Sequence, residues 1–170
     1  MKINKFVSLL ALYFLIFSGC EGSKFPLSDP SDSSIDERFI GSWGMLEPDE
    51  DGGASFLNIF AFNEHEYYVE GWDKGDEDEM MRLNAFSTEI DDVWFANIQC
   101  INCDEDESGY FFFKYNLNPQ DELLVYGINE DFYDELKESE SIRSVRSFIR
   151  KRMGDADFLE DEFARYRRLD

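Results

Sequence analysis

The chain has 170 residues and a formal net charge of −22 at pH 7, because 38 aspartate and glutamate residues outnumber 16 lysine and arginine residues. A chain this acidic repels the phosphates of nucleic acids, so we expect no nucleic-acid partner. Hydrophobic residues make up 43% of the sequence and include 17 phenylalanines, which is enough for the core of one domain and excludes a wholly disordered chain.

The N-terminus has the pattern of a secretory signal. Lys2 and Lys5 precede an apolar run from Phe6 to Phe17. The run is shorter than the about 20 apolar residues that a membrane-spanning helix needs, and its basic flank is typical of a signal peptide. The sequence therefore predicts export.

Two small residues and a cysteine end this signal. Ser18, Gly19 and Cys20 resemble the lipobox of bacterial lipoproteins, in which the peptide is cleaved before the cysteine. The resemblance implies a signal peptide over residues 1–19 and a diacylglyceryl anchor on Cys20. With Glu21 at the next position it also implies attachment to the outer membrane, on the periplasmic or the surface side. An ordinary cleaved signal beside an unrelated cysteine is the alternative.

The segment after the signal is polar. Residues 21–36 are rich in serine, aspartate, proline and glycine, a composition typical of flexible linkers. We therefore predict a flexible tether over 20–36 and one folded domain over 37–170.

Short runs dense in phenylalanine, tyrosine, valine and isoleucine follow, each bounded by turn residues such as Asn118-Pro119-Gln120-Asp121. Their spacing predicts an antiparallel barrel or sandwich. In the run 55–62 both faces are apolar, so we expect this strand to be covered on both sides. The predicted strands are 39–46, 55–62, 66–72, 80–90, 93–101, 110–117, 122–128 and 163–169.

The pattern changes to helical spacing before the last strand. Residues 131–137 form one short predicted helix, and a second begins after an N-cap at Ser141 and ends at Met153 before Gly154. Basic side chains on the polar face of this second helix suit the negative end of its dipole. The alternative is a docking surface for an acidic partner or lipid phosphate. The arginines that would form it are Arg143, Arg146 and Arg150.

Gly41-Ser42-Trp43, in the first predicted strand, resembles the Gly-x-Trp signature of lipocalin-like β-barrels, and the last strand supplies arginines as that family does. The resemblance implies a mainly β fold, an up-and-down antiparallel barrel of about eight strands with one or two helices before the last strand. It further implies that Trp43 closes one end of the barrel under an arginine. We assign Gly41, Trp43 and Arg168 to this barrel-end signature, because a guanidinium on an indole face contributes about 0.5–2 kcal/mol.

Cys100 and Cys103 are the sharpest local signal in the predicted domain. Outside the cytoplasm, cysteines this close usually form a disulfide, and we predict one here. A redox motif would need a helix N-terminus that lowers the thiol pKa, whereas the acidic run 104–107 follows. A zinc site needs about four ligands, and the chain has a single histidine, His65. We therefore predict no metal and no cofactor.

We predict a noncatalytic protein, because His65 lies in a predicted turn between glutamates and no nucleophile–base pair is apparent. The leading hypothesis is a membrane-anchored envelope lipoprotein whose barrel binds a small hydrophobic or amphipathic ligand. The alternative is an envelope interaction or assembly lipoprotein that binds an envelope protein through its acidic face or its basic helix. An eight-stranded barrel can be filled or hold one small ligand, and the phenylalanine content favours a filled interior.

Overall fold

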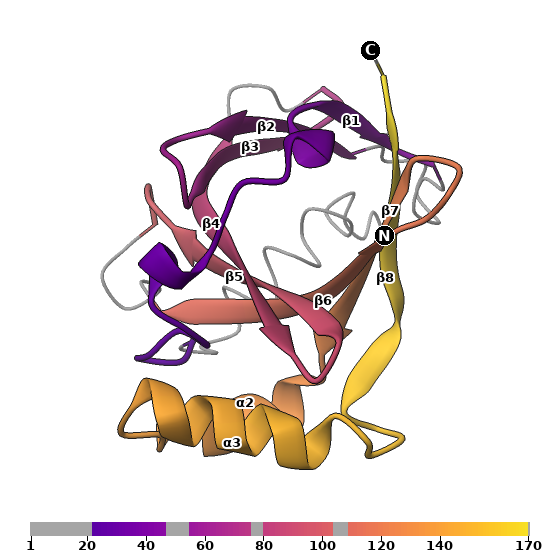
Figure 1. Ribbon diagram of the computed structural model, residues 1–170. Coiled ribbons are helices and arrows are strands. Elements are labelled where there is room, and N and C mark those ends of the chain that lie inside the picture. The colour runs from indigo at the N-terminus through magenta and orange to yellow at the C-terminus, as the bar shows by residue number, and fades with distance from the viewer. Residues whose placement is uncertain (1–21, 47–54, 76–79, 104–108, 170) are drawn as a thin grey trace, which may run out of the picture.

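The computed structural model describes residues 22–46, 55–75, 80–103 and 109–169, with the side chains of 161–163 excepted. Within these residues eight antiparallel strands form a closed barrel in which each strand pairs with its neighbours in sequence and β1 pairs with β8 (Figure 1). This confirms the predicted eight-stranded up-and-down barrel. The strands are β1 (Gly41–Met45), β2 (Ser55–Ala61), β3 (Tyr67–Asp73), β4 (Met81–Ile90), β5 (Val93–Cys100), β6 (Tyr110–Leu117), β7 (Glu122–Ile128) and β8 (Leu159–Arg168).

Two strand boundaries differ from the prediction by more than one residue. The first strand begins at Gly41 rather than at residue 39, because Glu37–Phe39 forms a short 3-10 helix, η2, that is capped by Asp36. The last strand begins at Leu159, four residues before the predicted start, and reaches Arg168. The extra length lets β8 pair with β7 along most of that strand and still reach β1.

The connections at one end of the barrel are tight. Asp91 and Asp92 link β4 to β5 with φ angles of 50° and 66°, the left-handed pair that a two-residue hairpin requires. Asp121 adopts a φ of 56° in the turn between β6 and β7. Aspartate tolerates this conformation better than most residues, which explains why acidic residues occupy these turns.

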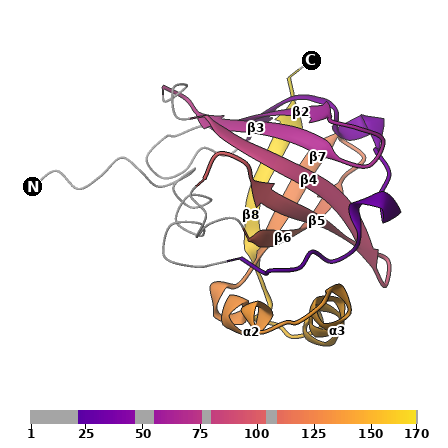
Figure 2. The same cartoon turned by 90° about the vertical axis from the view of Figure 1, so that its left-hand side faces the viewer.

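Two helices lie outside the barrel, next to β5 and β6 (Figures 1 and 2). They are α2 (Tyr133–Lys137) and α3 (Ile142–Arg152), and both come before the last strand as predicted. Ser141 caps α3 and exchanges hydrogen bonds with Ser144, which confirms the predicted N-cap. The helices and the barrel wall bury a second apolar layer outside the barrel, formed by Phe95, Phe112, Leu136, Val145, Ile149 and Phe158.

The predicted flexible tether is wrong over residues 22–36, which pack against the barrel. Ser23 pairs with Tyr110 at the start of β6. Leu27 is completely buried, and its backbone N–H donates to Oδ1 of Asn97 at 2.7 Å. The Ser28 and Thr88 hydroxyls lie 2.6 Å apart. The polar composition suggested a linker, but these serines and the leucine supply partners for the outer face of β4 and β5.

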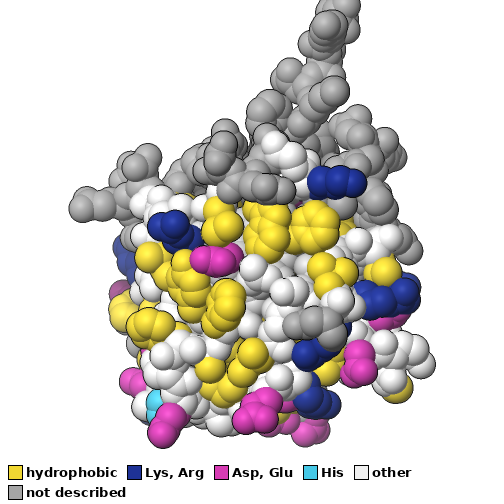
Figure 3. Space-filling model, turned by 90° about the horizontal axis from the view of Figure 1, so that it is seen from above, with side chains coloured by type: hydrophobic (Ala, Val, Ile, Leu, Met, Phe, Trp, Pro, Cys, Tyr) yellow, Lys and Arg dark blue, Asp and Glu magenta, His cyan; other side chains and the backbone are white. Residues whose placement is uncertain are grey.

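Hydrophobic side chains gather on the face of the molecule seen in Figure 3. On β2 and β3, aromatic residues are register partners. Phe56 stacks on Trp72 with ring centroids 5.8 Å apart, and Phe60 lies 6.2 Å from Tyr68. Phe60 is 45% exposed. The expectation that this strand is covered on both sides is therefore wrong, because the helices and the N-terminal segment cover other strands.

Candidate binding site

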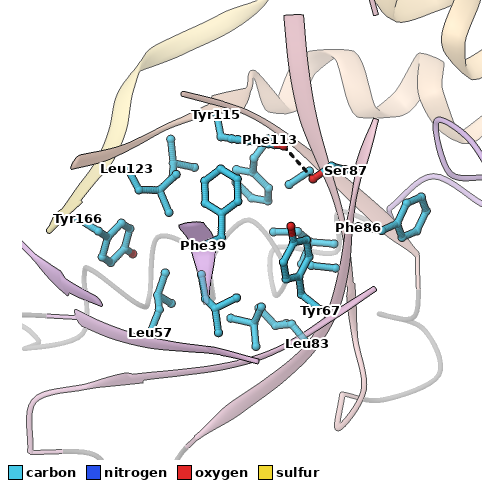
Figure 4. A pocket seen from close by; sticks show the side chains of 16 residues that line it. Phe39, Leu57, Tyr67, Leu83, Phe86, Ser87, Phe113, Tyr115, Leu123 and Tyr166 are labelled. Atoms are coloured by element: carbon cyan, nitrogen blue, oxygen red, sulfur yellow. Dashed lines mark hydrogen bonds between the residues drawn. The ribbon is translucent and has the colours of Figure 1, made fainter. Parts of the chain in front are cut away.

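The barrel interior contains a partly open cavity of about 130 Å³. Strand alternation builds most of it, because inward residues of each strand line the space and their neighbours point outward. The expectation of a filled interior is therefore wrong. The sixteen lining residues are Phe39, Leu57, Ile59, Tyr67, Val69, Leu83, Ala85, Phe86, Ser87, Ala96, Ile98, Phe113, Tyr115, Leu123, Val125 and Tyr166 (Figure 4). Phe86, between the inward Ala85 and Ser87 on β4, is the exception to the alternation and lies apart from the other labelled rings (Figure 4).

Small inward residues on two adjacent strands contribute to this space. Ala85 and Ser87 lie on β4, and Ala96 lies opposite Ser87 on β5. Many of the phenylalanines that favoured a filled interior are elsewhere: Phe95 and Phe112 face the outer layer, and Phe60 faces solvent. Composition alone could not assign these rings to one layer or the other.

One end of the barrel is closed by the predicted barrel-end signature. The Arg168 guanidinium lies 4.9 Å from the centroid of the Trp43 ring, and the two residues are register partners on β8 and β1. Arg168 also donates to the carbonyls of Ile40, at 2.9 Å, and Arg38. Gly41 has a φ of 137°, a conformation that L side chains rarely adopt, which explains a glycine where the chain turns from η2 into β1.

Phe39 links this closed end to the cavity. The Trp43 indole N–H donates to the Phe39 carbonyl at 2.9 Å, so the tryptophan holds η2 in place. The Phe39 ring then lies edge-on to Tyr115 at 5.3 Å and to Tyr67 at 6.4 Å. Gly41, Trp43 and Arg168 therefore form one structural unit. This unit holds Phe39 in place as a plug at the base of the cavity.

Three hydroxyls gather near this plug. Tyr115 Oη donates to Ser87 Oγ at 2.8 Å, and Tyr67 Oη accepts from the Asp36 backbone N–H at 2.6 Å. Burial raises the pKa of Tyr115 to about 12 and also raises the pKa of Tyr67. These phenols are therefore neutral at physiological pH, and each has its hydrogen-bonding partner within the protein.

Tyr166 is the fourth hydroxyl of the cavity and differs from the other three. Its side chain is only 7% exposed, and its hydroxyl has no hydrogen-bond partner among the described residues. Burial, followed by the nearby Asp73 carboxylate, raises the pKa of Tyr166. Sequence reasoning assigned no role to Tyr166, although its place two residues before Arg168 puts it on the same inward face of β8.

The cavity lining carries no charged side chain among the residues described. An apolar enclosure with a few hydroxyls is typical of sites for small hydrophobic or amphipathic molecules. The chemistry of this cavity lining therefore favours the binding of a molecule of that kind.

The cysteines predicted to pair are joined by a disulfide in the structure, with their Cα atoms 5.7 Å apart. Asn102, between them, accepts from the Arg82 backbone N–H at 2.9 Å and donates to the Met80 carbonyl at 3.1 Å. The disulfide loop is thereby attached to the start of β4. Cys20, the predicted lipidation site, lies outside the described residues.

The three arginines predicted to dock a partner lie on α3, and two of them bind the barrel. Arg146 donates to the carbonyls of Leu27 and Glu89, both at 3.2 Å. Arg150 pairs with Asp91 in the β4–β5 turn at 2.9 Å. Arg143 is exposed. The helix therefore uses most of this basic face to attach itself to the N-terminal segment and the hairpin.

Across the described ranges, no group of three or more histidine, cysteine, aspartate or glutamate side chains is placed to hold a metal ion. No helix in the described part of the chain is long and apolar enough to cross a membrane.

Comparison with known proteins gave no match to a family model, to a curated protein or to a solved structure. The class assignment therefore rests on the molecule itself. A closed antiparallel barrel of eight described strands, plugged at one end by a tryptophan under an arginine, is consistent with a lipocalin-like barrel.

Proposed function

We propose that this protein is a noncatalytic envelope lipoprotein whose barrel binds one small hydrophobic or amphipathic molecule. The apolar cavity carries the proposal. Its volume of about 130 Å³ is close to that of engineered apolar cavities of about 150 Å³, which bind benzene. The signal-like N-terminus and the resemblance of Ser18-Gly19-Cys20 to a lipobox support anchoring at the outer membrane.

The cavity size limits the ligand. A molecule comparable to a single six-membered ring fits this volume, whereas a long-chain lipid would require the barrel to expand. Leu57, Ile59 and Val69 offer an aliphatic wall, and Phe113 offers an aromatic one. Toluene is therefore a suitable first probe.

The proposal is tested by titrating the protein with toluene while recording amide resonances by NMR. We expect saturable shifts at residues that line the cavity. Ala96→Leu places a larger side chain in the cavity and should abolish these shifts, whereas Ala156→Leu, at an exposed position outside the barrel, should leave them unchanged. Absence of saturable shifts in the wild-type protein, or shifts that stay equally large in Ala96→Leu, would contradict binding in the cavity.

The alternative function, an envelope interaction protein acting through α3, has weaker support. Arg146 and Arg150 already bind the barrel and the N-terminal segment, which leaves Arg143 as the exposed member of the predicted docking set. These contacts account for the basic face of the helix without an external partner.

A further inference from the structure

We propose that the Tyr166 hydroxyl hydrogen-bonds an uncharged polar group of the cavity ligand, so that the barrel prefers a small neutral amphiphile over a hydrocarbon of equal size and over an anion. This inference rests on the proposed ligand binding and deepens it by naming the chemistry of the ligand.

The tyrosines of the cavity differ in whether their hydroxyls have hydrogen-bond partners. The hydroxyls of Tyr67 and Tyr115 are bonded to Asp36 and Ser87 at 2.6 and 2.8 Å. Tyr166 is also buried, yet its hydroxyl has no hydrogen-bond partner within the described structure. Buried tyrosine hydroxyls normally have a partner, so a hydroxyl that faces the cavity and is unpaired among the described residues is available to a polar group of a bound ligand.

The Tyr166 ring lies on the inward face of the barrel wall. Tyr166 pairs in register with Met45 on β1 and Leu123 on β7, which fixes its side chain on the inward face of β8. Figure 4 shows the ring extending from the strand into the cavity, with its oxygen at the end away from the backbone. A ligand in the cavity therefore meets this oxygen beside an otherwise apolar wall.

The charges around the cavity disfavour an anionic ligand. No lysine, arginine or histidine lines the cavity among the described residues. An anion would lose its hydration without gaining a counter-ion, which is strongly unfavourable in an apolar enclosure. The Asp73 carboxylate, close enough to raise the pKa of Tyr166, adds repulsion. The cavity therefore selects against carboxylates and accepts a neutral hydroxyl or carbonyl group.

Phenol and toluene separate the hydrogen bond from the apolar contact, because they have nearly the same shape and differ in a hydroxyl against a methyl group. We expect the wild-type protein to bind phenol about tenfold more tightly than toluene in NMR or calorimetric titrations at pH 7, the effect of about one hydrogen bond. Benzoate should bind more weakly than either probe.

Tyr166→Phe removes only the hydroxyl and should abolish the preference for phenol while toluene affinity is retained. Tyr126→Phe is the matched control, because this tyrosine lies outside the cavity lining, and it should keep the preference. Equal wild-type affinities for phenol and toluene, a preference that survives Tyr166→Phe, or tighter binding of benzoate or benzylamine would each overturn the inference. The wild-type comparison needs no variant to fold. Absence of all binding would instead contradict the proposed function itself.

Discussion

At the scale of single residues, the cavity tyrosines couple the stability of the barrel to alkaline pH. Burial raises the pKa of Tyr115 to about 12, above its ordinary value of 10. Because the phenol is neutral in the folded state, its contribution to the free energy of unfolding is fully present below pH 10. Above that pH the unfolded chain loses the proton first, so the contribution declines as pH rises toward 12.

We expect the free energy of unfolding of the wild-type protein to fall between pH 10 and pH 12, by at most about 1.4 kcal/mol per pH unit for Tyr115. Tyr115→Phe should make this decline shallower. Urea titrations at several pH values measure how the free energy of unfolding changes with pH in the wild-type protein and in Tyr115→Phe. Tyr126→Phe, at a tyrosine that lies outside the cavity lining, is the control and should leave the wild-type slope unchanged. An equal slope in wild type and Tyr115→Phe would contradict this reading of the residue.

At the scale of elements, one buried asparagine joins the N-terminal segment to the barrel wall. Asn97 is completely buried on β5 and accepts from Leu27 at 2.7 Å. Its amide group donates to the Phe86 carbonyl at 3.2 Å and to Thr88 Oγ1 at 2.8 Å. Every polar atom of the side chain is thus engaged in an otherwise apolar layer, which makes its contacts costly to lose.

Asn97→Leu should destabilise the fold by about 1–3 kcal/mol for each buried group left unpaired. Because the Leu27 N–H is one of these groups, residues 22–36 should also gain hydrogen exchange and protease sensitivity. Asn116→Leu, at an exposed position on β6, is the matched control and should leave both unchanged. A destabilised variant whose N-terminal segment remains protected would show that Asn97 supports the strand alone.

The elements also show what the sequence could and could not reveal. Turn residues such as Asp91 and Asp92 punctuate the chain, so the strands and the cap at Ser141 were predictable. Asn97 resembles a surface residue in the sequence, and Phe56 and Phe112 resemble core residues. The surroundings of all three depend on which outer faces the helices and the N-terminal segment cover. That choice depends on tertiary contacts such as Arg150 with Asp91, which strand periodicity does not encode.

The candidate site was predictable at its closed end and not in its interior. Gly41 and Trp43 form a short local motif, and Arg168 could be added because the last strand of a barrel meets the first. The cavity depends instead on the sum of many side-chain volumes, in which Ala85 and Ala96 offset the larger rings. A single sequence gives no direct measure of that balance.

At the scale of the whole molecule, the membrane anchor remains a prediction from the N-terminal sequence. Cys20→Ser should move the protein from the membrane fraction to the soluble fraction, because only the acyl chains would hold it. Mass spectrometry of the wild-type protein should show the mass of a lipidated N-terminal cysteine. A Cys20→Ser variant that keeps its mass and still sediments with membranes would contradict the anchor.

The docked N-terminal segment has a mechanical consequence for an acylated protein. Ser23 is already bonded to Tyr110 through both backbone hydrogen bonds, at 2.9 and 2.8 Å, so a lipid on Cys20 would leave almost no slack before the barrel begins. The barrel could not swing freely above the bilayer. It would stand with the start of β6 toward the lipid and the Trp43–Arg168 plug, at the opposite end of the barrel, directed away from it.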